Sequence, residues 1–415
     1  MKEKSRYLFW LFFIPVLICI GCRSHTSDRE ATQERVELES NDYINLVEAW
    51  VDSIQTTMSL EEQVGQLFMP SSFANNDVST LHQLRQYIAD NHVGGILFLK
   101  GDVISQAFLS DTLQSISRIP LFIGIDAEWG LNMRLNDAPR FPINYLLGET
   151  EDDQLMYDYG REVGREAQLL GINMVMGPVL DVLTNVDNRV IGKRAFSDNP
   201  RVVAEMAVAY ARGMEDANVL SIGKHFPGHG ATVKDSHKEL PVVSYDIQHL
   251  DTVDFLPFKE YVKNNLSGVM VGHLYMPAID SVKRSATLSP VVMTDFLKTK
   301  LGFDGLILTD AMNMGGVGDT ENISVEAILA GADIIVSPKN TSKEINRVLE
   351  AVRNGELPHE LIRSKCRKVL FYKYKVGLYE RVDIDVDSSI EEVNNSLSLR
   401  MKHRLDSAVN AKMNQ

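Results

Sequence analysis

The sequence has little cysteine, with only Cys19, Cys22 and Cys366 among its 415 residues. Cys19 and Cys22 fall at the end of an apolar N-terminal run, where an export signal would remove the first and engage the second. Cys366 would then stand alone, which excludes a fold held together by a disulfide framework. Cys366 lies in a segment of helical pattern, residues 360–378, where we expect an inert, buried thiol.

Positive charge is also scarce. The chain has 42 Lys and Arg against 56 Asp and Glu, a net charge of −14 at pH 7. Proteins that bind nucleic acid phosphates are more often basic, so we expect no nucleic acid partner. Apolar residues make up 44% and charged residues 24% of the chain, which is ordinary for a globular enzyme, and no internal repeat or low-complexity block occurs.

Long apolar runs are limited to one, from Leu8 to Gly21, which follows the positively charged segment MKEKSR. Its length suits an export signal and is short for a transmembrane helix. The run ends at Gly21-Cys22 and resembles a bacterial lipoprotein signal in which Cys22 is lipidated, although Cys19 stands where leucine is usual. A plain cleaved signal and an uncleaved anchor are the alternatives. We predict an exported protein, lipid-anchored to the bacterial cell envelope at its periplasmic or outer-membrane face.

The rest of the chain divides by composition into three parts. Residues 23–42 are polar and predict a flexible tether after a signal over residues 1–22. Residues 43–380 carry the recurring apolar runs of a catalytic domain. Residues 381–415 are polar with a weak helical pattern, and we expect a short helical tail or a frayed end.

Eight short apolar runs recur, most of them followed by an amphipathic segment. Continuous apolar strands that alternate with helices are typical of a parallel sheet covered by helices. Eight such units favour an α/β fold of the (β/α)₈ barrel type. A flavodoxin-like or Rossmann sheet is the alternative, but no G-x-G-x-x-G motif joins a strand to a helix. The runs are residues 65–70, 94–99, 120–126, 172–178, 220–227, 268–273, 305–310 and 332–338.

Polar residues cluster where several of these runs end, which in a barrel is the face that carries chemistry. Asp126 ends the third run, Lys224-His225 the fifth, His273 the sixth and Asp310 the seventh. Apolar residues would serve stability better at these positions, so the convergence of polar ones predicts a site.

The motifs around these positions resemble glycoside hydrolase family 3, in the branch of the β-N-acetylhexosaminidases. The resemblance covers about residues 45–380, and KHFPGHG followed by DSH is its most specific piece. The matching segments are IDAEWGLNMRL (125–135), GKRAFSDNP (192–200), KHFPGHG…DSH…LP (224–241) and LTDAMNM (308–314).

The resemblance implies a retaining mechanism with an unusual acid/base. Asp310 matches the family's nucleophile, although an aspartate at a strand end can also be a helix N-cap. His237 matches the acid/base, because an imidazole can release and regain a proton near neutral pH. Asp235 matches the residue that orients His237 and stabilises its charged form. A solvated loop histidine is the simpler reading of an isolated D-x-H.

The resemblance also implies the residues that bind the terminal sugar: Asp126, Arg134, Arg194, Lys224 and His225. Surface ion pairs would be the simpler reading of the two arginines.

His229 lies four residues after His225, a spacing that imitates a metal-binding pair on a helix. Pro227, Gly228 and Gly230 make a helix there implausible. We therefore expect that His229 braces the loop, and we expect neither a metal nor another cofactor.

The expected substrate is a GlcNAc-containing glycan or muropeptide. Trp129 departs from the family, whose members commonly have a second glycine there, and leaves the sugar preference open. Three alternatives remain: a β-N-acetylglucosaminide phosphorylase, a β-glucosidase, and an inactive lipid-anchored glycan-binding protein.

Overall fold

The computed structural model describes residues 42–232, 236, 239–318 and 320–414. Contacts divide the chain into two units, residues 1–46 and 47–415, and the fold lies in the second. The predicted signal, Cys22 and the tether up to residue 41 lie outside the described residues. None of the helices in the described ranges has the length and apolar content needed to cross a membrane.

All the pairings between the named strands are parallel. Each of the eight predicted apolar runs overlaps one of these strands, and β2 follows the first run directly after Pro70. The strands are β1 (Phe68–Met69), β2 (Ser71–Ala74), β3 (Gly95–Gly101), β4 (Phe122–Ile125), β5 (Met174–Val175), β6 (Leu220–Phe226), β7 (Gly268–Val271), β8 (Leu306–Thr309) and β9 (Ile335–Val336).

The larger sheet has seven strands in the order β2-β3-β4-β5-β6-β7-β8, and β1 pairs with β9 in a second sheet. Backbone hydrogen bonds connect the two. The N–H of Gly94 donates to the carbonyl of Phe68 at 3.0 Å, and the N–H of Thr309 donates to the carbonyl of Ile334 at 3.0 Å. The α/β class and the parallel sheet are therefore confirmed. In this sheet, strands that are neighbours in the sequence are also neighbours in space. In Rossmann and flavodoxin-like sheets the strand order instead reverses at a switch point, so the alternative fold is not supported.

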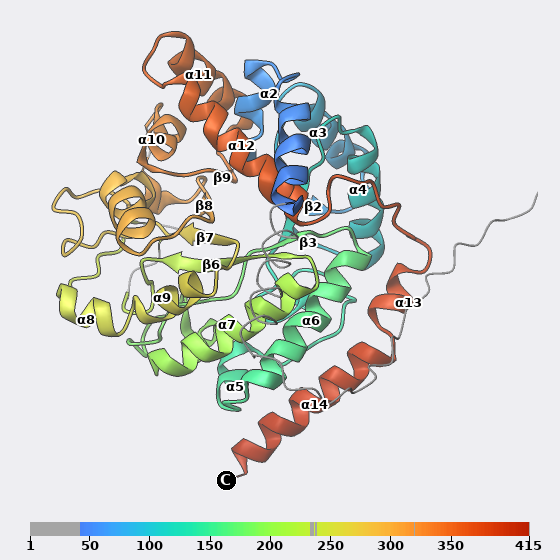
Figure 1. Cartoon of the computed structure of the whole chain (residues 1–415). Coiled ribbons are helices and arrows are strands. Elements are labelled where there is room, and N and C mark those ends of the chain that lie inside the picture. The colour runs from blue at the N-terminus through green and yellow to red at the C-terminus, as the bar shows by residue number, and fades with distance from the viewer. Residues whose placement is uncertain (1–41, 233–235, 237–238, 319, 415) are drawn as a thin grey trace, which may run out of the picture. The chain divides into compact units, whose positions relative to one another are not determined.

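Helices connect successive strands and surround them (Figure 1). Side chains of Asp77, Asp102, Asp152 and Asn340 accept backbone hydrogen bonds at the starts of four of them, which is why these helices begin there. The helices are α2 (Leu60–Gly65), α3 (Val78–Ala89), α4 (Val103–Ile116), α5 (Asn144–Gly148), α6 (Asp153–Leu169), α7 (Pro200–Asp216), α8 (Ile247–Thr252), α9 (Leu256–Lys263), the π-helix η4 (Val291–Lys300), α10 (Ile323–Ala330), α11 (Thr341–Arg353) and α12 (His359–Lys375).

The core fixes the strand ends that carry the site. Phe226, the last residue of β6, is fully buried and packs edge-on against Phe258 of α9, with ring centroids 5.2 Å apart. Phe296 of η4 lies on the same ring at 6.3 Å. Burial of one such side chain stabilises the fold by about 1.5–3 kcal/mol, so the end of β6 has little freedom to move.

After α12 the chain forms α13 (Ser389–Val393) and α14 (Ser396–Met413). Ser398 of α14 donates a hydrogen bond to Glu162 of α6 at 2.6 Å, and Arg165 donates to both of them. Met401, Leu405 and Val409 of α14 are buried. The boundary at residue 380 stays a prediction.

Cys366 is buried in α12, as predicted. Burial raises the pKa of its thiol to about 12, so the thiol stays protonated and unreactive at physiological pH.

Candidate active site

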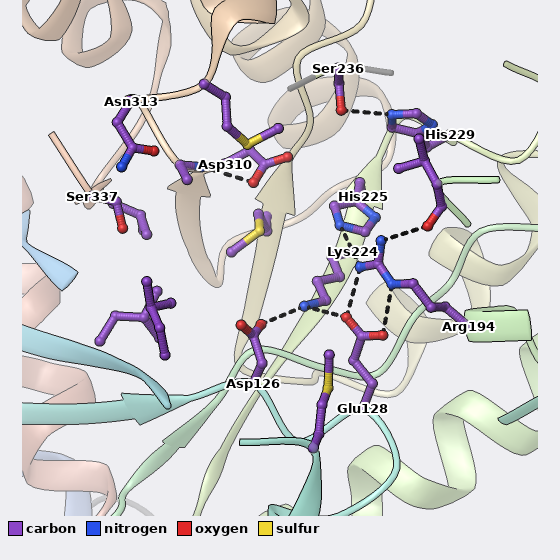
Figure 2. Close-up of a pocket in the computed structure, with 18 of the residues that line it drawn as sticks. Asp126, Glu128, Arg194, Lys224, His225, His229, Ser236, Asp310, Asn313 and Ser337 are labelled. Carbon is purple, nitrogen blue, oxygen red and sulfur yellow. Dashed lines mark hydrogen bonds and ion pairs between the residues drawn. The ribbon is translucent and has the colours of Figure 1, made fainter. Parts of the chain in front are cut away.

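A pocket of about 440 Å³ opens where the parallel strands end (Figure 2). Most of its walls come from the carboxyl ends of strands and the segments that follow them, which is the face predicted from the sequence. Polar residues line much of the pocket and apolar residues the remainder. The lining residues are Leu97, Leu99, Asp126, Glu128, Met133, Arg134, Val190, Arg194, Lys224, His225, His229, Ser236, Met270, Asp310, Ala311, Asn313, Met314, Val336 and Ser337.

Asp126 and Lys224 come from the end regions of two different strands and form an ion pair in the pocket wall. The Lys224 Nζ donates to Asp126 Oδ1 at 2.7 Å, and Arg134 donates to Asp126 Oδ2 through Nε at 3.1 Å and NH2 at 2.5 Å. Burial alone would raise the pKa of Asp126, but the charges of Lys224 and Arg134 outweigh burial and lower it. Asp126 is therefore a carboxylate that can accept hydrogen bonds from a ligand in the pocket.

Glu128 links two of the cations and is itself fully buried. It accepts a bidentate pair from Arg194, with Nε at 2.9 Å and NH2 at 2.7 Å, and Lys224 Nζ lies 2.8 Å from its Oε1. Burial raises the pKa of Glu128, but Arg194 and Lys224 outweigh it and hold the pKa well below its usual range. The result is a chain of charge-assisted contacts from Arg134 to Arg194, and Figure 2 shows its part from Asp126 through Lys224 and Glu128 to Arg194.

His225 is oriented by Asp181, which follows β5. His225 Nδ1 lies 2.7 Å from Asp181 Oδ2, and Arg194 NH2 lies 3.3 Å from His225 Nε2. A guanidinium can only donate, so Nε2 accepts and Nδ1 carries the proton that is donated to Asp181. The same aspartate accepts the backbone N–H of His229 at 2.7 Å. One buried carboxylate thus fixes both histidines of the KHFPGH segment.

His229 braces the loop after β6, as predicted. Its ring lies between the hydroxyl groups of Thr232, 2.8 Å from Nδ1, and Ser236, 3.0 Å from Nε2. Burial lowers the pKa of His229 to about 4, so the ring is neutral at physiological pH. Gly230 lets the loop pack closely, because a Cβ there would come within 1.6 Å of the Val182 carbonyl oxygen.

Asp310 follows β8 and lines the pocket. Its Oδ1 accepts the N–H of Ala311 at 2.8 Å, and its own N–H donates to the carbonyl of Val271 at 2.9 Å. Burial would raise the pKa of Asp310, but His273 and the N–H of Ala311 outweigh it and lower the pKa. Asp310 is held as a carboxylate, the form that a nucleophile requires.

The structure brings the predicted residues together. Asp126, Arg134, Arg194, Lys224, His225 and Asp310 all line the pocket. Asp235 and His237 lie outside the described residues, but Ser236 between them lines the same pocket. The Ser236 carbonyl accepts a hydrogen bond at 2.9 Å from the N–H of Gly316, which belongs to the segment after Asp310.

Two residues at predicted strand ends do not reach the pocket wall. His273 is buried, and its Nε2 lies 3.0 Å from the carbonyl oxygen of Ala311, directly after Asp310. Trp129 is half-buried and is not among the described lining residues, so we find no contact by which it narrows the pocket.

The sequence interpretation assigned no role to two buried carboxylates, Glu128 and Asp181. Glu128 lies in the quoted segment IDAEWG, and Asp181 follows the fifth strand in GPVLD. The position of Asp181, a charged residue shortly after a buried strand, could have indicated a role in the site. Within the described ranges, no group of three or more His, Cys, Asp and Glu residues is arranged to hold a metal ion.

A family model described as "Glycosyl hydrolase family 3 N terminal domain" matches residues 59–371. The chain belongs to glycosyl hydrolase family 3. The family predicted from the motifs is therefore confirmed, and the pocket lies inside the matched region.

Proteins of similar sequence have names that belong to the β-N-acetylhexosaminidase branch predicted from the motifs. "Beta-hexosaminidase A" of Pseudoalteromonas piscicida is 31% identical over 380 residues, 80% of this chain and 64% of that protein. "Beta-N-acetylglucosaminidase/beta-glucosidase" of Cellulomonas fimi is 26% identical over 348 residues, 81% of this chain and 61% of that protein. The chain thus spans less than two thirds of the length of both.

A solved structure has the same fold. It is a glycoside hydrolase family 3 beta-N-acetylglucosaminidase from Paenibacillus sp. str. FPU-7, with a TM-score of 0.80 and 31% identity. The match covers 85% of this chain and 69% of that one.

Proposed function

We propose that this protein is a retaining, exo-acting β-N-acetylhexosaminidase that removes terminal N-acetylglucosamine from β-glycosides such as peptidoglycan fragments. One observation carries the proposal: the ionised Asp310 shares a pocket with the Asp126–Lys224 pair and with Ser236, the neighbour of both predicted acid/base residues. The names of the relatives support the same substrate class.

In the first step the Asp310 carboxylate attacks the anomeric carbon and forms a glycosyl ester. The bond to the leaving oxygen breaks, and His237 gives that oxygen its proton. In the second step His237 takes a proton from water, the water oxygen bonds to the anomeric carbon, and Asp310 leaves as a carboxylate. Asp235 would orient His237 and stabilise its charged form. The roles of His237 and Asp235 rest on the sequence motif.

The sugar is held by groups that the fold has already fixed. Asp126 accepts hydrogen bonds from outer hydroxyl groups, and Arg134, Lys224, Arg194 and His225 supply donors or acceptors around it. Because these side chains are held by one another before substrate arrives, hydrogen bonds that strengthen in the transition state cost little reorganisation. A pocket of about 440 Å³ lies at the small end of ligand pockets, which span about 300–1,000 Å³, and this favours a terminal sugar.

Charge pairing favours hydrolysis over phosphorolysis. Each cation among the described lining residues already contacts a carboxylate: Arg134 and Lys224 contact Asp126, and Arg194 contacts Glu128. A phosphate ion entering as the acceptor would have to displace such a pair, whereas water would not. β-Glucosidase activity remains the alternative with the same hydroxyl contacts, and one relative is named for both activities.

The test is an assay of purified protein with aryl β-N-acetylglucosaminide and aryl β-glucoside, each in phosphate and in phosphate-free buffer. We expect faster phenol release from the N-acetylglucosaminide, free N-acetylglucosamine as product in both buffers, and no turnover by Asp310→Asn. Sugar 1-phosphate would indicate a phosphorylase. Folded protein that binds glycan but turns over no glycoside would indicate a binding protein.

For the cell, we propose export and lipid attachment at Cys22. The support is the sequence Leu8–Cys22 alone, in which an apolar run of signal length ends directly before a cysteine.

For the fold, we propose a closed (β/α)₈ barrel. Three contacts support it: the β1–β9 pairing, the bridge between Leu308 and Ile334 that joins β8 to β9, and the hydrogen bond from Gly94 to Phe68 that joins β1 to the start of β3.

A further inference from the structure

Asp254 is a buried carboxyl group that the proposed mechanism does not use. It lies between α8 and α9, and 1% of its surface is exposed. Within the described ranges neither carboxyl oxygen has a hydrogen-bond partner. A buried carboxylate without a partner is strongly disfavoured relative to the neutral acid, so this position calls for an explanation beyond packing.

The carboxyl group packs against the turn that carries the site histidines. A Cβ on Gly228 would lie 2.9 Å from the Asp254 Cβ and 3.1 Å from its Oδ1, so the two residues are in contact. Gly228 has a φ of +126°, a conformation that side chains rarely adopt, and its N–H donates to the carbonyl of His225 at 2.8 Å. The turn is thus held by His225 and Asp181 on one side and by Asp254 on the other.

Two titratable groups face Asp254. From α8, His249 Nε2 lies 3.9 Å from Asp254 Oδ2, and its ring packs against Tyr245 with centroids 4.0 Å apart. From the segment after β5, the negative charge of Asp181 acts on Asp254. From the turn, Gly228 contacts Asp254 and brings no charge to it. Burial, and next Asp181, raise the pKa of Asp254 to about 7.

We propose that Asp254 is a positioning residue for the Gly228–His229 turn, and that it keeps the turn in its active geometry only while its carboxyl group is protonated. Ionisation would place a second negative charge against the turn. This charge would be repelled by the carboxylate of Asp181 and would have no hydrogen bond from the described residues to stabilise it. Water would then draw the carboxylate away, and the turn would lose its support. This inference rests on the proposed glycosidase activity, since it concerns the alkaline loss of that activity.

The experiment compares the wild type with Asp254→Asn, whose amide has the same shape and cannot ionise. We would measure kcat/KM from pH 5 to pH 9 with an activated aryl β-N-acetylglucosaminide, because a good leaving group reduces the need for the His237 proton. About one Asp254 in ten is protonated at pH 8, so the wild type should lose about tenfold between pH 6 and pH 8. Asp254→Asn should lose much less.

Asp251→Asn is the matched control. Asp251 is in α8, is half exposed and pairs with Lys259 at 2.6 Å, so its variant should keep the wild-type pH profile. Should Asp254→Asn fail to fold, Asp254→Ser is also neutral at every pH and carries the same comparison. Identical alkaline limbs in the wild type and the Asp254 variant would overturn the proposal while leaving the glycosidase function intact.

Thermal unfolding gives a second readout that needs no activity. The native state keeps a proton on Asp254 that the unfolded chain releases near pH 4, so the contribution of Asp254 to wild-type stability declines as pH rises from about 4 to about 7. The difference between the Tm of Asp254→Asn and that of the wild type should therefore shift in favour of the variant as pH rises through this window. Above about pH 7 the difference should stay constant. A constant difference at all pH values would refute a buried neutral acid, even if the protein cleaved no glycoside.

Discussion

Replacing Glu128 by alanine should destabilise the protein far more than the loss of an ordinary ion pair. Glu128 is fully buried, and its removal costs Arg194 two hydrogen bonds and Lys224 one ion pair at 2.8 Å. Breaking a buried pair typically costs about 3–5 kcal/mol. Arg194 keeps its bond to the Val190 carbonyl and Lys224 keeps Asp126, so we expect a loss near the low end, about 3 kcal/mol.

Urea unfolding at pH 7, followed by fluorescence, would measure the free energy of unfolding of the variant. The matched control is Glu356→Ala, which removes an exposed pair with Arg347 at 2.5 Å and should cost about 0–1 kcal/mol. Glu128→Ala should also lower kcat/KM, because Arg194 and Lys224 lose the partner that fixes them. Equal losses of stability in the two variants would show that the buried network contributes no more than a surface contact.

Three further predictions concern single residues. His237→Ala should lower kcat/KM by about 10²–10⁴-fold for glycosides with poor leaving groups and far less for activated aryl ones, and equal losses would argue against an acid role. Native His229 takes up a proton only near pH 4, whereas the unfolded residue does so near pH 6.5, so the contribution of His229 to stability should fall by up to about 3 kcal/mol as pH drops through this window. In urea unfolding, the stability of His229→Gln relative to the wild type should increase as pH drops through this window, and a constant difference would contradict the buried neutral ring. Cys22→Ser should move the protein expressed with its own leader out of the bacterial membrane fraction, and unchanged fractionation would contradict lipidation.

Much of the fold was readable from the sequence because its strands are buried on both faces. Such strands appear as continuous apolar runs, and each of the eight predicted runs overlaps a strand. β2 was not predicted as a separate strand, since Ser71–Ala74 carries two serines and follows a proline. The π-helix at Val291–Lys300 also had no signal, because its apolar spacing is that of an ordinary helix.

The site was predictable wherever a residue stands at a strand end. Asp126, Lys224 and Asp310 lie far apart in sequence and meet because parallel strands share their carboxyl edge. The supporting carboxylates were harder to find. Glu128 and Asp181 contact the side chains of Arg194 and His225, which are 66 and 44 residues away in the sequence. Only the folded chain reveals such pairs.

The chain of charges from Arg134 to Arg194 also constrains how this pocket can change during evolution. Its members are contributed by segments up to 98 residues apart, and the loss of charge at any one of them removes an ion-pair partner from another. Selection should therefore act against single substitutions at these positions. Substitutions that persist should occur together at two or more of them. In an alignment of homologues, the residues at positions 126, 128, 194 and 224 should covary as one unit.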